Sequence, residues 1–380
     1  MTIAVISMIR DAWGGSEELW YEMAKEAIKE GHKVVHLAFE HPVKHLKIAE
    51  LESLGMQRIA RPGWIPNTSP AGRFMHLGWN YLRKKVADPF KKILALQPDV
   101  ILYNGTCYSI AAEKGLLKTL SQPAYQHIPF YIIGHLNHDG IRDIDNAQAA
   151  VIKQAYRRCK KVFFVSQRNI DTAERHLCAA IPNAEIISNP VNLSLTEAIP
   201  FPEKKDSISF AMVGNLVTTH KGQDLMLQAL SKWKETAWML NIYGNGMDLS
   251  YLKALTTHLQ LQQKVNFHGN VSNIREIWEE NQVLLMPSHM EGMPLAVVEA
   301  MLCGRVCIAT NVGGINEWIT DGETGFIAAA PTVALLLQAL ETAWAKKRDW
   351  PEIGNAAHQA AIKRYDPQAG KNLLRRIIAP

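Results

Sequence analysis

The sequence predicts an α/β protein with two doubly wound domains, each built on a parallel sheet. Short apolar runs alternate with longer amphipathic runs, which is typical of stacked β-α units. The alternation forms two series, separated at residues 186–207 by a stretch with three prolines and no periodicity. A chain of 380 residues is long enough for two such domains.

The first series predicts an N-terminal Rossmann-like domain over residues 1–190. MTIAVISMI has too short an apolar run and no basic front for an export signal, so it predicts a first buried strand. The expected strands cover residues 2–9, 32–39, 98–104, 124–130 and 160–166. The expected helices cover residues 16–30, 75–96, 108–120, 145–158 and 167–178.

The second series predicts a C-terminal Rossmann-like domain over residues 207–365, after a linker at 191–206. A closing helix at 366–380 is expected to pack back on the first domain. Ligands of such sheets bind at the carboxyl ends of the strands, and two facing domains leave a cleft. The expected strands cover residues 207–214, 238–244, 264–269, 283–288, 305–310 and 325–328.

Composition and charge narrow the class of protein. Five cysteines without a CxxC pair fit buried thiols in a reducing compartment, and no window approaches a membrane span, so we expect a cytoplasmic protein. Residues 58–92 carry eight basic residues against one acid, interleaved with aromatics. This stretch predicts either contact with an anionic acceptor or the inner face of a membrane, or a solvated helix face beside core aromatics. We expect no nucleic-acid partner.

Two glycine turns follow expected strands. Gly14 and Gly15 precede a helix whose N-cap is Ser16, an arrangement that suits either an anion or a tight connection. The turn lacks the GxGxxG pattern, which disfavours a nicotinamide cofactor. Lys221 and Gly222 open a later helix without the Walker pattern, so Lys221 either neutralises a phosphate or is a surface lysine.

The segment SHMEGMPLAVVEAML places two carboxylates around a helix start. Pro294 fits the first helical turn, which puts Glu291 in the loop and Glu299 within the helix. The amides of Gly292, Met293 and Leu295 then lie at a helix N-terminus, which favours an anion. The carboxylates are either exposed acids or acceptors for ligand hydroxyls. The apolar run at 296–302 indicates a buried helix and favours the second reading.

These motifs resemble glycosyltransferase family 4, retaining nucleotide-sugar glycosyltransferases with the GT-B fold. The resemblance covers nearly the whole chain and is strongest over residues 210–328. The matching pieces are GGSEELWYEMAKEAIKEGHKV, PDVILYN, YQHIPF, VSQRN, IISNPVN, VGNLVTTHKGQDLMLQAL, LNIYGNGMD, VNFHGNV and SHMEGMPLAVVEAMLCGRVCIATNVGGINEWITDGETGFIA.

The resemblance implies roles for individual residues. Glu299 is expected to bind ribose hydroxyls, Glu291 to face the donor sugar, and Lys221 to neutralise the diphosphate leaving group. His127, at the end of YQHIPF, is expected to contact the sugar. Three groups complete the expected nucleotide-sugar site: Gly15 in the first glycine turn, the segment Gly292, Met293, Pro294 and Leu295 at the sugar and diphosphate, and Gly269, Asn270 and Val271 at the base.

The chain departs from the family at Asn215, where arginine is usual. Asparagine offers dipoles but no charge, so either Lys221 does more of the work or Arg10, Lys33 or another cation compensates. Slow turnover, or binding without catalysis, is the remaining explanation. The resemblance implies retaining transfer without a metal or other cofactor. Asp143-Ile144-Asp145 has the spelling of a metal-binding pair but lies outside the expected nucleotide half.

The expected function is transfer of a hexose from a nucleotide-diphosphate sugar to a saccharide or lipid-linked acceptor. UDP-glucose is the first candidate donor, with UDP-N-acetylglucosamine, UDP-galactose and GDP-mannose also open. The acceptor side suggests polysaccharide synthesis in the cell envelope or an exopolysaccharide. The alternatives are a catalytically weak or inactive nucleotide-sugar-binding protein with the GT-B fold, and a GT-B sugar-nucleotide epimerase.

Overall fold

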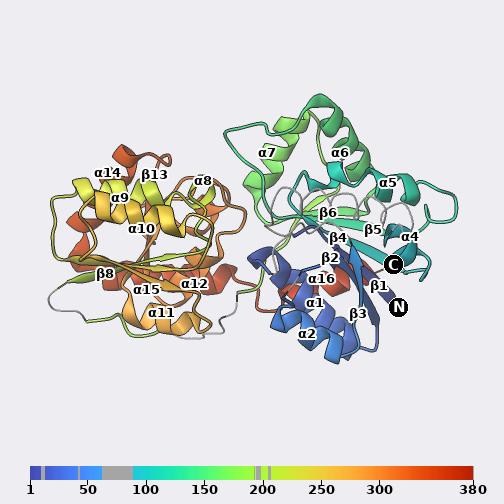
Figure 1. The fold of residues 1–380 in the computed structure, drawn as a ribbon, viewed down its shortest axis with the longest axis horizontal. Coiled ribbons are helices and arrows are strands. Elements are labelled where there is room, and N and C mark those ends of the chain that lie inside the picture. The colour runs from blue at the N-terminus through green and yellow to red at the C-terminus, as the bar shows by residue number, and fades with distance from the viewer. Residues whose placement is uncertain are drawn as a thin grey trace, which may run out of the picture. The chain divides into compact units, whose positions relative to one another are not determined.

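The computed structural model describes residues 1–9, 13–41, 43–61, 89–191, 193, 198–203 and 207–379. These residues form two compact units, each built around one parallel sheet (Figure 1). The predicted α/β fold with two doubly wound parallel sheets is therefore confirmed. Unit 1 comprises Met1–Asn137, Ile141–Pro190 and Gln368–Pro380, and unit 2 comprises His138–Gly140 and Val191–Pro367.

Unit 1 holds a sheet with the strand order β3-β2-β1-β4-β5-β6-β7, in which every neighbouring pair is parallel. The order reverses between β1 and β4, which is the switch point of a doubly wound sheet. Its described elements are β1 Thr2–Ser7, η1 Gly15–Glu17, α1 Glu18–Lys29, β2 Lys33–Phe39, α2 Leu46–Ser53, β3 Gln57–Arg61, α4 Pro89–Leu94, β4 Val100–Gly105, η2 Ser109–Ala112, α5 Lys114–Leu120, β5 Phe130–Gly134, α6 Asn146–Arg158, β6 Lys161–Phe164, α7 Gln167–Leu177, β7 Ala184–Ile186 and α16 Ala369–Ile378.

The strands of unit 1 supply two separate cores. On β1, Ala4 and Ile6 enter one core, whereas Ile3 and Val5 enter the other. This alternation follows the two-residue period of a strand, whose successive side chains point to opposite faces. Because helices cover both faces, the strand is apolar at almost every position.

The last helix, α16, completes the core on one face of unit 1. It lies beside α1, although the two helices stand at opposite ends of the chain (Figure 1). Leu373, Leu374 and Ile377 are buried in the same core as Leu19 and Trp20 of α1. Their spacing puts them on one helix face, which explains why a short amphipathic C-terminal helix is ordered there.

Unit 2 repeats the arrangement with the strand order β10-β9-β8-β11-β12-β13, again parallel throughout. Its switch point lies between β8 and β11. Its described elements are β8 Ile208–Val213, α8 Thr218–Lys221, α9 Gln223–Lys232, β9 Trp238–Tyr243, α10 Leu249–His258, β10 Val265–Gly269, α11 Ile274–Glu280, β11 Val283–Met286, α12 Leu295–Leu302, β12 Val306–Thr310, α13 Ile315–Trp318, β13 Phe326–Ala328, α14 Val333–Ala345, η3 Lys347–Asp349 and α15 Trp350–Arg364.

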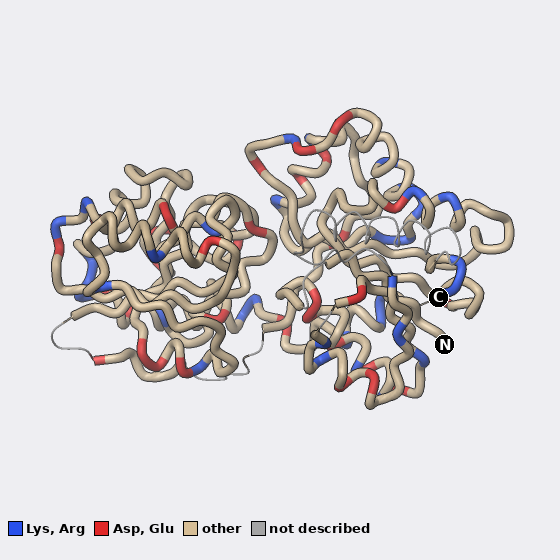
Figure 2. The backbone as a smooth tube through the Cα atoms, in the orientation of Figure 1, with Lys and Arg blue, Asp and Glu red and all other residues tan. Residues whose placement is uncertain are grey.

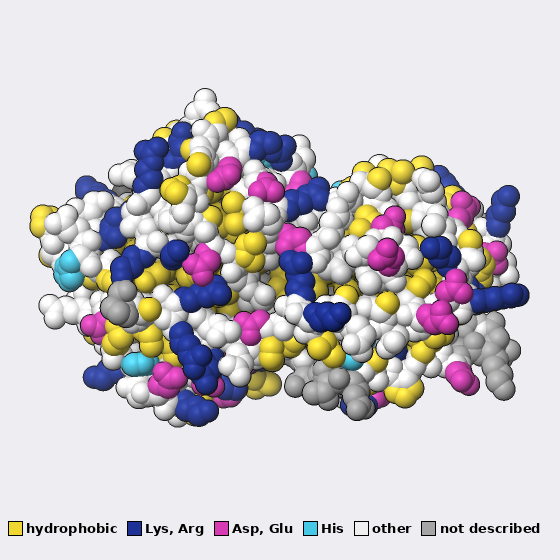
Figure 3. Space-filling view, turned by 180° about the vertical axis from the view of Figure 1, so that it is seen from behind, with side chains coloured by type: hydrophobic (Ala, Val, Ile, Leu, Met, Phe, Trp, Pro, Cys, Tyr) yellow, Lys and Arg dark blue, Asp and Glu magenta, His cyan; other side chains and the backbone are white. Residues whose placement is uncertain are grey.

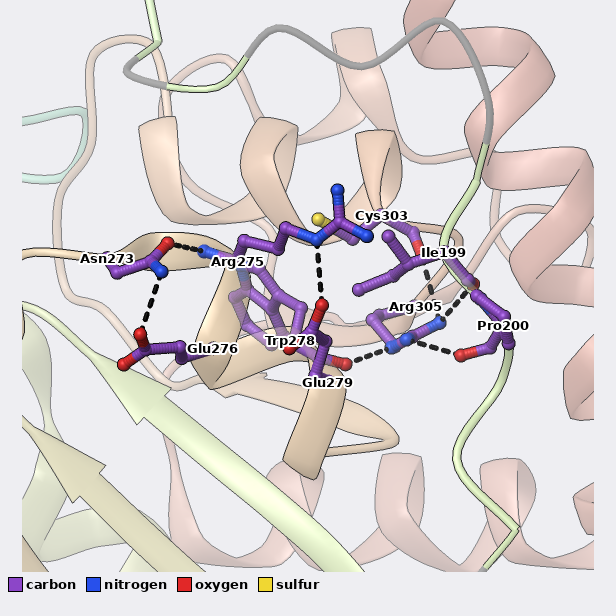
Figure 4. A network of polar contacts seen from close by, with 9 residues as sticks. All are labelled: Ile199, Pro200, Asn273, Arg275, Glu276, Trp278, Glu279, Cys303 and Arg305. Carbon is purple, nitrogen blue, oxygen red and sulfur yellow. Dashed lines mark hydrogen bonds and ion pairs between the residues drawn. The ribbon is translucent and has the colours of Figure 1, made fainter.

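Part of the segment expected to be a linker is held in unit 2 by Arg305, which is fully buried (Figure 4). Its guanidinium donates to the carbonyls of Ile199 (3.1 Å) and Pro200 (2.8 Å). It also donates to the carbonyls of Trp278 (2.7 Å) and Cys303 (2.8 Å). Burial lowers the pKa of Arg305 to about 10, so the side chain stays charged at neutral pH. One cation thus ties the segment before β8 to α11 and to the end of α12.

Two expectations about single elements need correction. The expected helix at 108–120 is divided into η2 and α5, and the expected strand at 124–130 is wrong, because β5 covers Phe130–Gly134. Of the expected helix at 75–96, residues 75–88 lie outside the described residues, and the rest contains α4. The short strands β3 and β7, at the two edges of the sheet, were not expected.

Basic and acidic residues are interspersed along the described chain of both units (Figure 2). The face seen in Figure 3 carries the same mixture among apolar and neutral side chains. Most of the basic and aromatic stretch at 58–92 lies outside the described residues, so its membrane or acceptor role stays a prediction. Arg61, which is described, is buried and pairs with Glu113 at 2.9 Å.

Candidate functional site

The switch point of unit 2 brings together two residues that lie seventy positions apart in the sequence. Lys221 ends α8, which follows β8, and Glu291 lies in the loop after β11. The two strands are neighbours, so both loops leave the same edge of the sheet. Lys221 Nζ donates to Glu291 Oε1 at 2.6 Å. Glu291 is buried and Lys221 is mostly covered, so the pair is a charge-assisted contact with little exposure to water.

Gly222 sets the position of Lys221. It separates α8 from α9 and adopts the left-handed conformation, with φ of +62°. A Cβ atom at this position would lie 2.2 Å from the carbonyl oxygen of Pro287, which follows β11. Only glycine therefore allows the two loops to approach so closely. The N–H of His289 donates to the carbonyl of His220 at 2.8 Å and joins the same two loops.

The start of α8 is held by Asp248, in the loop after β9. The Asp248 carboxylate accepts from the N–H of Thr218 at 2.7 Å and from its hydroxyl at 2.9 Å. Thr218 is the first residue of α8, and Lys221 is the last. The N–H of Leu216 also donates to the carbonyl of Asn245 at 2.9 Å. The loop after β9 therefore fixes the short helix that carries Lys221.

Glu291 is held from the other side by the loop after β12. Gly313 has φ of +50°, and a Cβ there would lie 1.8 Å from the carbonyl oxygen of Glu291. The N–H of Gly314 donates to the carbonyl of Gly292 at 2.9 Å. Glycine at 313 thus permits this close packing, which fixes the backbone on both sides of Glu291.

The expected helix start next to Glu291 is present one residue later than predicted. Pro294 is the N-cap rather than a residue of the first turn, and α12 begins at Leu295. Gly292 and Met293 are buried beside it. Glu299 lies within α12 and is 7% exposed, and Glu291 is 5% exposed. The two carboxylates are therefore not exposed surface acids. The switch point thus combines a cation, two covered carboxylates and a helix N-terminus.

The other residues expected at the nucleotide lie along the same edge of the unit 2 sheet. Gly269 ends β10, the outermost strand, and Asn270 and Val271 follow it. Asn215 lies two residues after the end of β8 and is exposed. Its carbonyl accepts from the side chain of Gln223 at 2.9 Å.

Two expectations about unit 1 change. His127 is exposed in the turn before β5, so it lies at the amino edge of the sheet and not at the carboxyl edge where it was expected. The error has a physical reason, because β5 lies between β4 and β6 and Pro129 could not donate to a ladder within a central strand. Lys33 opens β2 at the same amino edge, whereas ligands of such sheets bind at the carboxyl ends of the strands. Arg10 lies outside the described residues.

His135 is a histidine at the carboxyl edge of unit 1, and it follows β5 directly. It is 7% exposed and its Nε2 lies 2.7 Å from Asn104 Oδ1, near the end of β4. Asn104 in turn donates to Glu17, next to the Gly14-Gly15 turn, at 2.7 Å. Gly15 itself begins η1 and is exposed. A buried polar network therefore occupies the switch point between β1 and β4.

Comparison with known proteins identifies the family of this fold and site. The protein-family model described as "Glycosyltransferase Family 4" matches residues 13–195 of the chain. The family model described as "Glycosyl transferases group 1" matches residues 196–363. The two matches adjoin and together run over nearly the whole chain. The chain belongs to the family 4 glycosyltransferases. The resemblance noted in the sequence is thereby confirmed.

This family 4 glycosyltransferase has relatives of known and unknown activity. It is 31% identical over 159 residues to an uncharacterized glycosyltransferase of Haemophilus influenzae, with 41% of this chain and 44% of that protein covered. It is 29% identical over 274 residues to the lipopolysaccharide 1,6-galactosyltransferase of Salmonella typhimurium, with 69% and 70% covered. The matches cover less than half the length of the first curated relatives.

The fold of this family 4 glycosyltransferase is similar to a crystal structure of Anabaena HepE in complex with UDP and glucose. The TM-score is 0.75 at 16% identity, and all of both chains is covered. At this identity the likeness concerns the fold, which is GT-B. Within the described residues, no helix is both long enough and apolar enough to cross a membrane.

Sequence reasoning missed four residues that shape the two switch points of this glycosyltransferase. They are Asp248 in unit 2 and Glu17, Asn104 and His135 in unit 1. A local signal existed for His135, because the apolar run FYIIG continues past Pro129 and ends in a histidine. No local pattern predicts the partner of Asp248, which lies 30 positions away in sequence.

Proposed function

We propose that this chain is a retaining hexosyltransferase that transfers a hexose from a UDP-sugar, with UDP-glucose as the first candidate, to a saccharide or lipid-linked acceptor. The observation that carries the proposal is the Lys221–Glu291 pair at the switch point of unit 2, beside the N-terminus of α12. A phosphate and a polyol need these groups close together: a cation, backbone amides at a helix N-terminus and carboxylates.

The proposed roles follow from the chemistry of each group. Lys221 neutralises the diphosphate, with Gly292, Met293 and Leu295 supplying backbone amides at the start of α12. Lysine has three donor hydrogens, so Lys221 is able to bind a phosphate oxygen without leaving Glu291. Glu291 accepts from sugar hydroxyls, and Glu299, one and a half turns further, accepts from the ribose.

The proposed reaction needs no separate general base and no metal. The bond between the anomeric carbon and the diphosphate oxygen breaks, and its electron pair stays on that oxygen. The acceptor hydroxyl oxygen bonds to the anomeric carbon from the same face, and its proton passes to the departing oxygen. The products are the new glycoside and a nucleoside diphosphate. Lys221 and the α12 amides stabilise the negative charge that develops on the leaving group.

Two of the compared proteins support the choice of donor and acceptor. Anabaena HepE was crystallised with UDP and glucose, and the Salmonella typhimurium relative is a lipopolysaccharide galactosyltransferase. We therefore propose that the donor is a UDP-sugar and that the acceptor belongs to cell-envelope or exopolysaccharide synthesis. A glucose donor and a galactose donor differ only in the configuration of one hydroxyl, so both are included in the test below.

Asn215 supports a second candidate function. The usual family arginine is missing, and the nearby Lys221 already neutralises a carboxylate. The chain would then bind a nucleotide sugar and turn it over slowly or not at all. Such a protein keeps every residue needed for affinity and lacks only part of the charge that stabilises the departing diphosphate.

A thermal-shift screen against nucleotide sugars separates these functions when it is followed by an assay of nucleoside diphosphate release. A ligand present at 100 times its Kd stabilises the folded state by about 2.7 kcal/mol. We expect one UDP-sugar to raise the Tm more than GDP-mannose does, and to be broken down with release of UDP. Stabilisation without release, with and without saccharide acceptors, would favour the binding protein. An equal rise in Tm with every nucleotide sugar would contradict the assignment of a UDP-sugar as the donor.

A further inference from the structure

Glu17 is a buried carboxyl group that the proposed reaction does not use. It is 2% exposed, and no cation pairs with it among the residues that the structure describes. Its two oxygens instead accept from three neutral donors. Ser7 Oγ and Trp20 Nε1 donate to Oε2 at 2.7 Å and 2.8 Å, and Asn104 Nδ2 donates to Oε1 at 2.7 Å. Such a group is expensive to bury and therefore calls for an explanation.

The donors around Glu17 fix the direction of the hydrogen bonds that follow. An ionised carboxylate only accepts, so the amide of Asn104 must turn its NH₂ group toward Glu17. The same NH₂ group makes a longer hydrogen bond, 3.3 Å, to the carbonyl of Ser16, which favours the same orientation. The Asn104 oxygen then faces His135 Nε2 at 2.7 Å, and an oxygen only accepts. His135 Nε2 must therefore carry the hydrogen. The other ring nitrogen, Nδ1, is left to accept from Asn189 Nδ2 at 3.4 Å.

We propose that Glu17 is a positioning residue that, through Asn104, holds His135 as the Nε2–H tautomer at the carboxyl edge of the unit 1 sheet. The relay runs across the switch point, from the turn after β1 through the end of β4 to the residue after β5. The tautomer decides which nitrogen of His135 donates and which accepts, and hence what the ring is able to hold. This inference goes beyond the proposed function, and it does not require that the chain transfer a sugar.

Replacing Glu17 by glutamine is expected to exchange the hydrogen-bond donors and acceptors along the relay. The indole N–H of Trp20 cannot accept, so the amide oxygen of Gln must occupy the Oε2 position. The amide NH₂ then faces the NH₂ group of Asn104 at a position 2.7 Å away, so Asn104 must turn its oxygen toward it and give up its longer, 3.3 Å hydrogen bond to the Ser16 carbonyl. Asn104 now presents its NH₂ group to His135 Nε2, which must accept. His135 therefore changes to the Nδ1–H tautomer.

Protonation of Glu17 allows the same inversion in the unmodified protein. Burial raises the pKa of Glu17 to about 7, and the neighbouring Glu18 carboxylate acts in the same direction, whereas the three donors act against it. Another titratable side chain on this side of Glu17 is His36, which packs on Trp20 with ring centroids 4.3 Å apart. Burial lowers the pKa values of His36 and His135 to about 3, so neither ring charges near neutrality. A change in the tautomer of His135 near neutral pH would then report the protonation of Glu17.

The test is nitrogen NMR of the full chain with labelled histidine, in which protonated and unprotonated ring nitrogens have distinct shifts. His135→Gln identifies the His135 signals by their loss. We expect Nε2–H at pH 8.5 in the wild type and Nδ1–H in Glu17→Gln. Glu18→Gln is the matched control, because Glu18 accepts from Trp13 and Lys47 and lies outside the relay, so it should leave the tautomer unchanged.

A second measurement does not depend on the variant folding. In the wild type, the His135 shifts should change with a midpoint near the pKa of Glu17, while the ring stays neutral. An Nδ1–H tautomer at pH 8.5, or shifts that stay constant between pH 5.5 and pH 8.5 together with an unchanged tautomer in a folded Glu17→Gln, would overturn the proposal. Either result leaves the transferase proposal untouched, because the readout is the tautomer and not turnover.

Discussion

Lys221 Nζ lies 2.6 Å from Glu291 Oε1, and the two residues come from loops after neighbouring strands of the unit 2 sheet. Each loop is fixed by a third element: Asp248 holds the start of α8, and Gly313 packs against the backbone of Glu291. A cation and a carboxylate that are held in contact in this way are already in place for a ligand that carries both phosphate and hydroxyl groups. Little reorganisation is then needed when the ligand binds.

Restoring the missing charge should strengthen binding. Asn215 is exposed beside the same edge of the sheet, so Asn215→Arg adds a guanidinium that is able to bind phosphate. We expect nucleoside diphosphate affinity to rise by roughly 5- to 10-fold, equal to about 1 kcal/mol, and to depend more steeply on salt. Calorimetry at two salt concentrations measures both effects. Asn215→Gln is the neutral control, and an unchanged affinity in the arginine variant would argue against a diphosphate near this loop.

Loss of the Asp248 carboxylate should loosen Lys221. Asp248→Ala removes the oxygen that accepts both Thr218 hydrogen bonds, and losing an interaction of this capping kind costs about 0.5–2 kcal/mol. We expect nucleoside diphosphate affinity to fall by roughly 10-fold. Thr218→Val removes only the hydroxyl donor and should lose less, whereas Asp248→Asn keeps an acceptor and should recover part of the affinity. Equal affinities in Asp248→Ala and the wild type would show that α8 does not need this contact.

Arg305 should contribute to stability rather than to binding. Arg305→Met leaves the buried carbonyls of Ile199 and Trp278, and the partly buried carbonyl of Pro200, without this donor, which costs on the order of 3 kcal/mol. Lysine has fewer donors and should recover only part of this loss. Chemical unfolding measures the difference. Arg275→Met is the control, because Arg275 is exposed and pairs with Glu279 within α11, so its effect should stay below about 0.5 kcal/mol.

Glu17 should lower the stability of the protein as the pH rises. Its pKa is about 7 in the folded chain, against an ordinary value of 4.5, so the folded state binds the proton more tightly than the unfolded state. Stability is therefore lost as pH rises from about 4.5 through about 7, by roughly 3 kcal/mol at most. Glu17→Gln carries no such charge. Its free energy of unfolding should rise relative to the wild type over this range, and a difference independent of pH would contradict the assignment.

How much the sequence predicts depends on how local each signal is. The strands of both sheets are predictable because two covered faces make them apolar at nearly every position, as in β1 and β8. The strand expected at residues 124–130 was wrong because an alternating stretch that contains Pro129 precedes β5. Periodicity predicted a strand there, and the missing backbone donor of proline excluded it.

The site was predictable where its residues follow strands, and not where they depend on partners. Lys221, Glu291 and Glu299 are recognisable by motif and by their place beside helix starts. The contact between Lys221 and Glu291 depends on β8 and β11 being neighbours, which chain order alone does not reveal. Asp248 and the Glu17 relay rest on hydrogen bonds between residues 30 and 87 positions apart, to which local patterns do not respond.

The most direct test of the account is the release of UDP from UDP-glucose and related UDP-sugars by the wild type, Lys221→Ala and Glu291→Ala. The account predicts release by the wild type with one of these donors, faster when a saccharide acceptor is present. Each variant should remain folded by circular dichroism and lose activity by a factor of about 100 or more, because leaving-group stabilisation or sugar positioning is gone. Equal rates in the folded Lys221→Ala variant and the wild type would contradict the central claim that this switch point binds the donor diphosphate.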